Sequence, residues 1–134
     1  MKARVHYSVP LLHVADVERS VAFYKVLGFT PNEILRKEDG LPFWAAMDCH
    51  KAGADEQTND NYTATIMFGL ASEPIDREKQ GALLYMYSLD LPGLRQKLVD
   101  AGASPTEIVP RFYMEKGELT VFDPDGYCIL IGQE

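Results

Sequence analysis

An internal repeat constrains the fold of this chain more than any other feature of its sequence. Residues 12–34 and residues 86–108 follow the same pattern 74 positions apart, without a gap. The identical pairs at this offset are Asp16 and Asp90, Gly28 and Gly102, Pro31 and Pro105, Glu33 and Glu107, and Ile34 and Ile108. Self-similarity at one fixed spacing indicates a duplicated structural unit, although strand-helix-strand units also share such punctuation by chance.

The matched residues have local structural roles. Asp16 and Asp90 each precede an apolar pattern with a period of 3.6 residues, where a carboxylate caps the N-terminus of a helix. Gly28 and Gly102 follow these patterns and supply the left-handed residue just past a helix end, and the prolines beyond them prevent the helix from resuming. Each copy therefore predicts a strand, a helix of about three turns and a second strand.

Further strands complete each half of the chain. The stretches FWAAMDC and YTATIMFGL belong to the first half, and ELTVFDPD and YCILIG, joined by a turn at Asp125-Gly126, belong to the second. The polar run 50–61 is typical of a hairpin loop, and 71–81 is typical of a connection between halves. The pattern predicts an α+β fold of two tandem βαβββ modules, at about 5–70 and 82–133, within one domain that spans 1–134.

Composition excludes several classes of partner. The formal net charge of −7 disfavours binding to nucleic acid and to anionic lipid surfaces. No apolar run approaches the roughly 20 residues of a membrane span, and the N-terminus lacks the pattern of a secretory signal, so we expect a cytoplasmic protein. Cys49 and Cys128 do not form a CxxC pair, and we expect two free thiols.

Two motifs resemble the vicinal oxygen chelate superfamily, which includes glyoxalase I, extradiol dioxygenases, fosfomycin resistance enzymes and bleomycin resistance proteins. They are PLLHVADVERSVAFYKVLGF at residues 10–29 and FDPDGYCILIG at residues 122–132. The resemblance extends from Val5 to Gly132. It implies two βαβββ modules that form an eight-stranded, U-shaped mixed sheet around a cavity, commonly as a homodimer.

The resemblance also implies where a metal would bind. In the metalloenzymes of the superfamily, four side chains hold a divalent ion, and the corresponding positions here are Val9, Leu83, Leu130 and a position at or beside Met67. Valine and leucine have no lone pair to offer, and a thioether is too soft for a hard divalent ion. Isoleucines flank Leu130 on both sides, so a register slip of one residue restores no carboxylate. We therefore expect neither a metal nor another cofactor.

Alternation along the strands indicates which side chains face the cavity. The predicted ligand-binding residues are Tyr7, Val9, His13, Trp44, Met67, Leu83, Tyr85, Tyr87 and Leu130. This mainly apolar and aromatic lining is typical of a small-molecule pocket, and the alternative is that the side chains simply pack as core. Trp44 suits a ligand contact and the core equally, and His13 suits a wall residue better than an acid or base. In the run Asp48-Cys49-His50, neighbouring side chains point to opposite faces, which argues against a metal cluster.

Three functions are compatible with these observations. The leading hypothesis is a metal-independent protein of the glyoxalase/bleomycin-resistance type that sequesters a small organic molecule, with cationic and aromatic compounds as candidates. The chief alternative is a metal-dependent lyase, isomerase or dioxygenase whose ligands come from His6, His13, His50 and Glu134. The third is a regulatory or structural dimer with a filled cavity. The sequence identifies no catalytic residue and no particular ligand, and it leaves open whether modules pair within one chain or between two.

Overall fold

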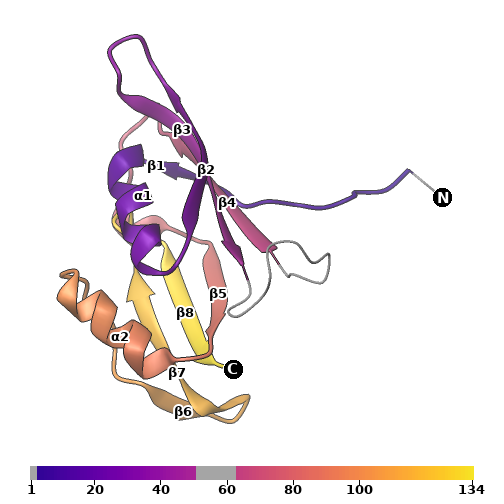
Figure 1. The fold of residues 1–134 in the computed structure, drawn as a ribbon, viewed down its shortest axis with the longest axis vertical. Coiled ribbons are helices and arrows are strands. Elements are labelled where there is room, and N and C mark those ends of the chain that lie inside the picture. Colours follow the sequence, from indigo (N-terminus) through magenta and orange to yellow (C-terminus); the bar gives the residue numbers. More distant parts are fainter. Residues whose placement is uncertain (1–2, 51–62) are drawn as a thin grey trace.

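The computed structural model describes residues 3–50 and 63–134 and contains the two expected βαβββ modules in an α+β fold (Figure 1). The first module comprises β1 (Leu11–Val14), α1 (Val17–Val26), β2 (Thr30–Arg36), β3 (Pro42–His50) and β4 (Thr63–Leu70). A connection with one turn of 3-10 helix, η1 (Arg77–Lys79), leads to the second module. That module comprises β5 (Leu83–Ser88), α2 (Leu91–Asp100), β6 (Val109–Arg111), β7 (Met114–Phe122) and β8 (Cys128–Gln133). Most of the hairpin loop predicted at 50–61 lies outside the described residues.

The eight strands form two four-stranded sheets with the same topology. Their orders are β1-β4-β3-β2 and β5-β8-β7-β6, and in each sheet the first strand pairs in parallel with the last strand of its module. The other pairs are antiparallel. This identical order confirms the duplication that the repeat predicted, and within the described residues of one chain the two sheets remain separate ladders.

The repeated residues perform the local roles expected of them. The Asp16 side chain accepts a hydrogen bond from the Arg19 backbone N–H, and the Asp90 side chain accepts one from the Gly93 N–H, so both helices are capped. Gly28 and Gly102 have φ values of 101° and 87°, a region that disfavours any residue with a Cβ. Neither helix has the length and apolar character needed to cross a bilayer, as judged over the described part of the chain.

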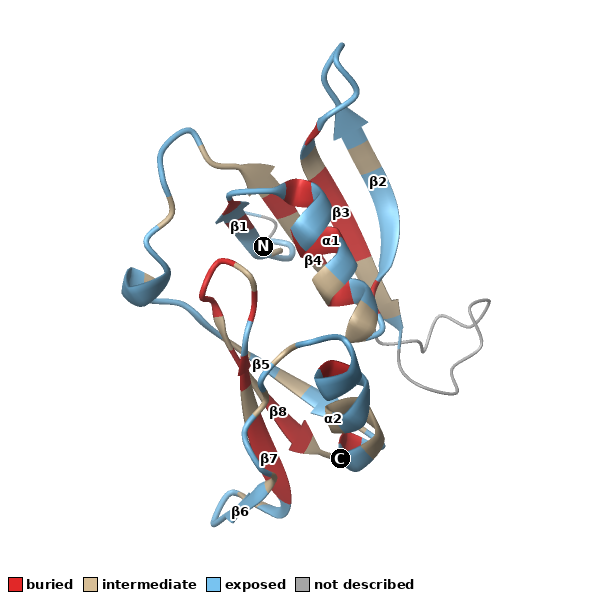
Figure 2. Ribbon diagram, turned by 90° about the vertical axis from the view of Figure 1, so that its left-hand side faces the viewer, coloured by how far each residue is buried: buried red, intermediate tan, exposed pale blue. Residues whose placement is uncertain are grey.

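Each helix covers one face of its own sheet, and both helices lie on the same side of the molecule (Figure 1). Tyr24 and Leu98 on the helices, and Phe68, Ile129 and Ile131 on the strands, are fully buried and belong to one continuous apolar cluster. Figure 2 shows the buried residues concentrated along β3, β7 and β8. Within residues 3–50 and 63–134, no helix lies over the opposite faces of the two sheets (Figure 1).

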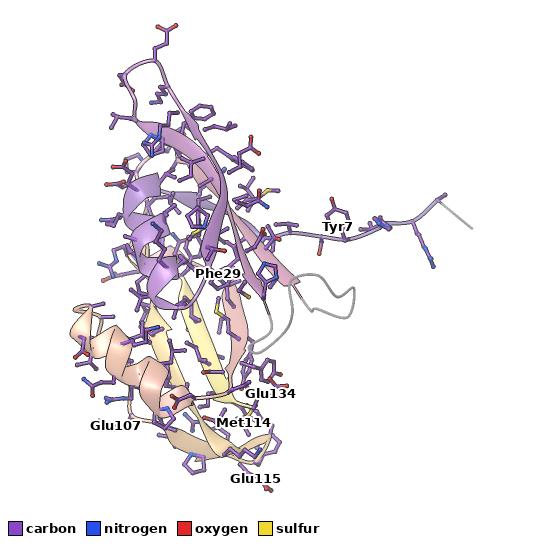
Figure 3. The ribbon with its side chains drawn as sticks, viewed as in Figure 1. Tyr7, Phe29, Glu107, Met114, Glu115 and Glu134 are labelled. Carbon is purple, nitrogen blue, oxygen red and sulfur yellow. The ribbon has the colours of Figure 1, made fainter. Side chains whose placement is uncertain are left out.

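The N-terminal segment before β1 runs away from the body of the molecule (Figures 1 and 3). The expectation that Tyr7 and Val9 belong to the first strand is wrong, because β1 begins only at Leu11. The last contact of this segment with the sheet is the hydrogen bond from the Met67 N–H to the Pro10 carbonyl, at 2.9 Å. Proline has no N–H with which to continue the ladder, so pairing stops there.

The turn between β7 and β8, residues 123–127, joins the two modules. Asp123 and Asp125 are each 1% exposed. The Asp125 carboxylate accepts hydrogen bonds from the Ala15 N–H at 2.9 Å and from the Ser20 hydroxyl at 3.4 Å, and it contacts the Arg19 guanidinium at 3.5 Å. These partners lie at the start of α1, so the second module is fastened to the first through a buried charge.

Asp123 completes this junction. Its Oδ2 accepts a hydrogen bond from the Tyr24 hydroxyl at 2.9 Å, and its Oδ1 accepts from the N–H groups of Asp125 and Tyr127. The Tyr127 hydroxyl in turn donates to the His13 carbonyl at 3.0 Å. Burial raises the pKa of the Asp123 carboxyl, and the three donors oppose that rise. The two aspartates form the turn, as expected, and they also hold the modules together.

Removing the Asp125 carboxylate is expected to destabilise the whole domain. Asp125→Ala removes the acceptor of the part-buried Ala15 N–H and of the buried Ser20 hydroxyl, and we expect a loss of about 3 kcal/mol in the free energy of unfolding. Urea unfolding followed by circular dichroism measures this loss. The control is Asp100→Ala at the exposed end of α2, with a change within about 0.5 kcal/mol. Equal losses in the two variants contradict the role of the junction.

Candidate functional site

The uncovered face of the second sheet is lined with large side chains. On β5, the exposed Leu83, Tyr85 and Tyr87 alternate with residues that are partly buried beneath α2. The register pairs Leu83 with Cys128 and Tyr85 with Leu130, so these β8 residues share that face, while Ile129 and Ile131 point into the core. Leu83 and Tyr87 are each 62% exposed, which is high for side chains of this kind.

The uncovered face of the first sheet is formed in the same way. Leu11 and His13 on β1 are exposed, whereas Leu12 and Val14 between and beyond them are buried. Gly69 on β4 faces the side chains of Leu11 and His13, and it pairs with Trp44 on β3. The register places Met67 beside Leu11 on the same face. We refer to these two helix-free surfaces as the open faces.

The structure divides the predicted site residues into three groups. His13, Trp44 and Met67 lie on the open face of the first sheet, and Leu83, Tyr85, Tyr87 and Leu130 lie on that of the second. Val9 precedes β1, and Tyr7 is 76% exposed on the N-terminal segment, away from both sheets (Figure 3). The two open faces belong to separate sheets, so within the described residues the predicted site residues lie on two separate surfaces.

The second open face also contains a buried carboxylate, Glu118, that was not among the predicted site residues. Glu118 on β7 pairs with Gly132 on β8, and it is only 5% exposed. Its carboxylate accepts hydrogen bonds from the Tyr85 hydroxyl at 2.6 Å and from the Tyr113 hydroxyl at 3.0 Å, and the Arg111 Nε lies 3.9 Å away. Gly132 leaves the space beneath this cluster, because a Cβ there would collide with Met114 and approach the Tyr85 hydroxyl.

Both tyrosines of this cluster are held in the neutral form. Burial and the hydrogen bond to Glu118 raise the pKa of the Tyr85 hydroxyl well above its usual range. The hydrogen bond to Glu118 is the main cause of the raised pKa of Tyr113. The signal for this cluster was present in the sequence, because Leu119 and Val121 point into the core and alternation therefore directs Glu118 to the open face.

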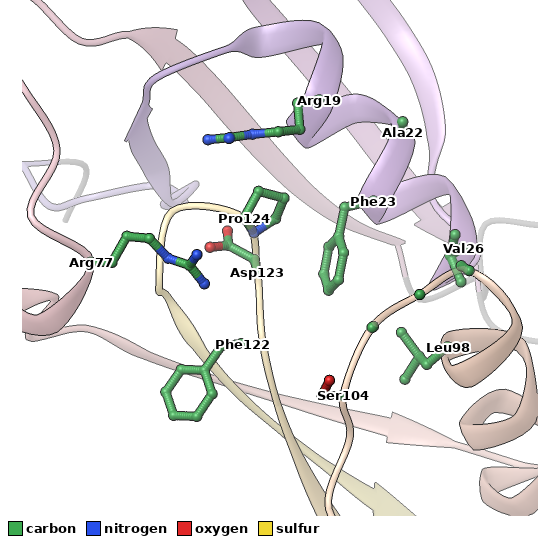
Figure 4. Close-up of a pocket in the computed structure, with 13 residues that line it drawn as sticks. Arg19, Ala22, Phe23, Val26, Arg77, Leu98, Ser104, Phe122, Asp123 and Pro124 are labelled. Atoms are coloured by element: carbon green, nitrogen blue, oxygen red, sulfur yellow. The ribbon is translucent and has the colours of Figure 1, made fainter.

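A cavity of about 610 Å³ lies on the helix side of the module junction (Figure 4). Phe23 and Val26 of α1, Leu98 of α2 and Phe122 of β7 supply apolar walls, and Arg19 and Arg77 lie at one side. It is separate from both open faces, because Phe23 and Leu98 come from the helices that cover the other side of each sheet. Arg19 is already engaged with Asp125 there.

Comparison with known proteins agrees with this architecture. The family model of the Glyoxalase/Bleomycin resistance protein/Dioxygenase superfamily matches residues 5–131. The chain belongs to this superfamily. No protein of curated function matches the sequence.

Solved structures of similar fold include antibiotic-binding members. A bleomycin resistance determinant encoded on the transposon Tn5 is 17% identical, with a TM-score of 0.66 over 97% of this chain and 98% of that chain. A bleomycin-binding protein complexed with bleomycin is 17% identical, with a TM-score of 0.65 over 97% and 99%. TnmS3, an antibiotic-binding protein from Streptomyces sp. CB03234, is 18% identical, with a TM-score of 0.66 over 99% and 98%. At these identities the likeness establishes the fold.

The resemblance to the superfamily assigns its metal-ligand positions to Val9, Leu83, Leu130 and a position at or beside Met67. Val9, Leu83, Leu130 and Met67 offer three hydrocarbon side chains and one thioether, which is a poor donor for a hard cation. Across residues 3–50 and 63–134, no three His, Cys, Asp or Glu side chains converge as a metal site. Among the alternative ligands, His6 lies on the N-terminal segment beside Tyr7, and His13 lies on β1. Glu134 follows β8 in the second module, near Met114 in the view of Figure 3.

The run Asp48-Cys49-His50 at the end of β3 is used within the sheet. The Asp48 carboxylate accepts hydrogen bonds from the Thr65 hydroxyl and from the Asn32 amide, each at 2.7 Å. Cys49 and Cys128 are both free thiols, as expected, and burial raises the pKa of each. A raised pKa favours the protonated thiol, which is less nucleophilic than a thiolate.

The hydrogen bond between Tyr85 and Glu118 makes these two residues part of the stability of the second sheet. Tyr85→Phe removes one donor to a buried carboxylate, and we expect the free energy of unfolding to fall by about 1 kcal/mol. Tyr87→Phe is the matched control, since within the described residues its hydroxyl has no hydrogen-bond partner, and we expect a change within about 0.5 kcal/mol. Urea unfolding of both variants tests this difference, and equal losses contradict it.

Proposed function

We propose that this chain is a metal-independent binding protein of the glyoxalase/bleomycin resistance superfamily that sequesters a small organic molecule between two copies of itself. The observation that carries the proposal is the pair of open faces, whose side chains are largely apolar and aromatic and remain exposed. A pocket for a drug-sized molecule combines such a lining with a few polar groups that orient the ligand. Here Glu118, the tyrosines and His13 supply the polar groups.

The extent of exposed surface supports association of two chains. The chain exposes 9080 Å², whereas a compact monomer of 15.0 kDa exposes roughly 7000 Å². Part of this difference belongs to the N-terminal segment before β1, which runs away from the body of the molecule. The exposed apolar side chains on the open faces are therefore the stronger support for association. Contiguous exposed apolar side chains of this kind mark interaction surfaces. A homodimer would bring an open face of one copy against an open face of the other and close a cleft between them.

The similar structures favour an antibiotic or a related compound as the ligand. Three of the solved neighbours are described as bleomycin resistance, bleomycin-binding or antibiotic-binding proteins, and each is superposed over nearly its whole length. We extend that activity to this chain as part of the proposal. The three hydrocarbon side chains and the thioether at the expected ligand positions support metal independence. The two free thiols suit a cytoplasmic location.

Dimerisation through the open faces predicts a specific defect in Leu83→Asp. An unpaired carboxylate in the interface is expected to weaken dimerisation at least about tenfold. Val99→Asp on α2 is the control, since Val99 is exposed on the helix side and the proposed interface does not include it. Light scattering after size exclusion measures the mass, with twice 15.0 kDa expected for the unchanged chain and for the control. A monomeric unchanged chain would contradict the proposal.

Ligand binding is tested by a thermal-shift screen over aromatic and cationic compounds, including bleomycin. A compound that binds only the native state at 100 times its dissociation constant adds about 2.7 kcal/mol of stability, which raises the melting temperature by several degrees. We expect the shift to persist in EDTA. A hit that EDTA abolishes favours the metal-dependent lyase, isomerase or dioxygenase, and a screen without hits favours a structural dimer.

A further inference from the structure

Glu118 is an unusual residue for an otherwise apolar and aromatic surface. Its side chain is 4% exposed, and it lies on the same face of the sheet as the exposed Tyr85 and Leu130. Burying a carboxylate at a largely apolar surface is unfavourable because the charge loses its hydration. An apolar residue at this position would avoid that desolvation penalty. The two tyrosine hydroxyls compensate for part of the lost hydration.

These hydrogen bonds also determine what the surface presents to a ligand. Because the Tyr85 and Tyr113 hydroxyls both donate to Glu118, their oxygen lone pairs remain available to accept hydrogen bonds from a ligand. The Tyr85 and Tyr87 rings lie 5.2 Å apart between centroids, with 51° between their planes, and Tyr87 and Tyr113 are more than half exposed. Aromatic faces and phenol oxygens above a buried negative charge form a surface that attracts cations.

We propose that Glu118, Tyr85 and Tyr113 form a receptor for the positively charged group of an organic ligand, an ammonium, amidinium or guanidinium. This inference rests on the proposed function and names the chemistry of the ligand for that same site. The charged group lies over the Tyr85 and Tyr87 rings and donates to the phenol oxygens. The ligand's apolar part lies along Leu83 and Leu130.

A cation of the protein itself, the Arg111 guanidinium, already lies near the Glu118 carboxylate. Its Nε lies 3.9 Å from the Glu118 carboxylate, and its side chain is 52% exposed, so this ion pair is long and solvent-screened. A guanidinium of the protein therefore already occupies the outer edge of the receptor and competes with a ligand cation. An anionic ligand would be repelled by the buried carboxylate, and a neutral ligand would leave Arg111 as the only cation near it among the described residues.

The test compares two ligands of nearly the same shape and different charge. Benzamidine carries a planar amidinium at pH 7, and benzamide is its neutral counterpart. NMR titration of the unchanged protein at fixed ionic strength measures both affinities. We expect benzamidine to bind about tenfold more tightly than benzamide, with the preference shrinking as salt is added.

Four variants assign that preference to the receptor. Glu118→Gln removes the charge and keeps the shape, and we expect the preference for benzamidine to disappear. Glu115→Gln is the matched control, because it removes the same charge from an exposed position of the same strand. Tyr113→Phe is expected to reduce the preference without touching the core. Arg111→Gln removes the competing cation, and we expect benzamidine to bind severalfold more tightly than to the unchanged protein.

Glu118→Gln is expected to abolish the preference for benzamidine, and Arg111→Gln is expected to strengthen benzamidine binding. If Glu118→Gln folds poorly, Arg111→Gln still tests the receptor. Equal affinities for the two compounds would overturn the cation receptor and leave the proposed binding function standing. Weaker benzamidine binding by Arg111→Gln would also overturn it. If neither compound binds while other compounds shift the melting temperature, the receptor is wrong and sequestration survives. If no compound shifts the melting temperature, both the cation receptor and the proposed sequestration are wrong.

Discussion

The structure depends above all on the two buried aspartates of the turn between β7 and β8. Asp125 satisfies donors at the start of α1, and Asp123 accepts from Tyr24 near the C-terminal end of that helix, across about a hundred residues of sequence. Burying two carboxylates so close together is unfavourable unless donors surround them, and the surrounding donors come from both modules. The charge is therefore well solvated by the protein only when the modules are docked, which makes docking part of the folding transition.

This junction also determines what the molecule shows to its surroundings. Fastening the β7–β8 turn to α1 places both helices on the same side, and the single apolar cluster continues from one module into the other beneath them. Both sheets consequently present their remaining faces without cover from any described helix. The uncovered face of the second sheet carries the exposed side chains of Leu83, Tyr85 and Tyr87. A sheet face in contact with water usually carries polar side chains instead. The same contacts that complete the core thus leave two surfaces suited to association.

Local patterns in the sequence predicted the parts of the structure that local chemistry determines. The capping aspartates, the left-handed glycines and the two βαβββ modules are confirmed, and His13, Leu83 and Tyr85 lie on the faces of their strands that point away from the helices. Alternation failed for Tyr7 because it assumes a strand, and Pro10 ends the pairing before that residue. The contacts of Asp123 and Asp125 with α1 could not be predicted from the sequence. A turn motif determines the local backbone conformation, but it does not indicate which distant helix packs against the turn.

Glu118 and the hydrocarbon side chains at the expected metal positions together determine which kind of cation this surface suits. Several converging carboxylates and imidazoles are needed to hold a divalent ion, and a lone carboxylate among leucines and tyrosines cannot replace that set. One negative charge is, however, matched by one positive charge on an organic molecule, which brings its own apolar surface to cover the remaining face. Tyr85 and Tyr113 keep the carboxylate ordered and dry without neutralising it. The surface is thereby better suited to a large, weakly hydrated organic cation than to a small metal ion that must lose its hydration shell.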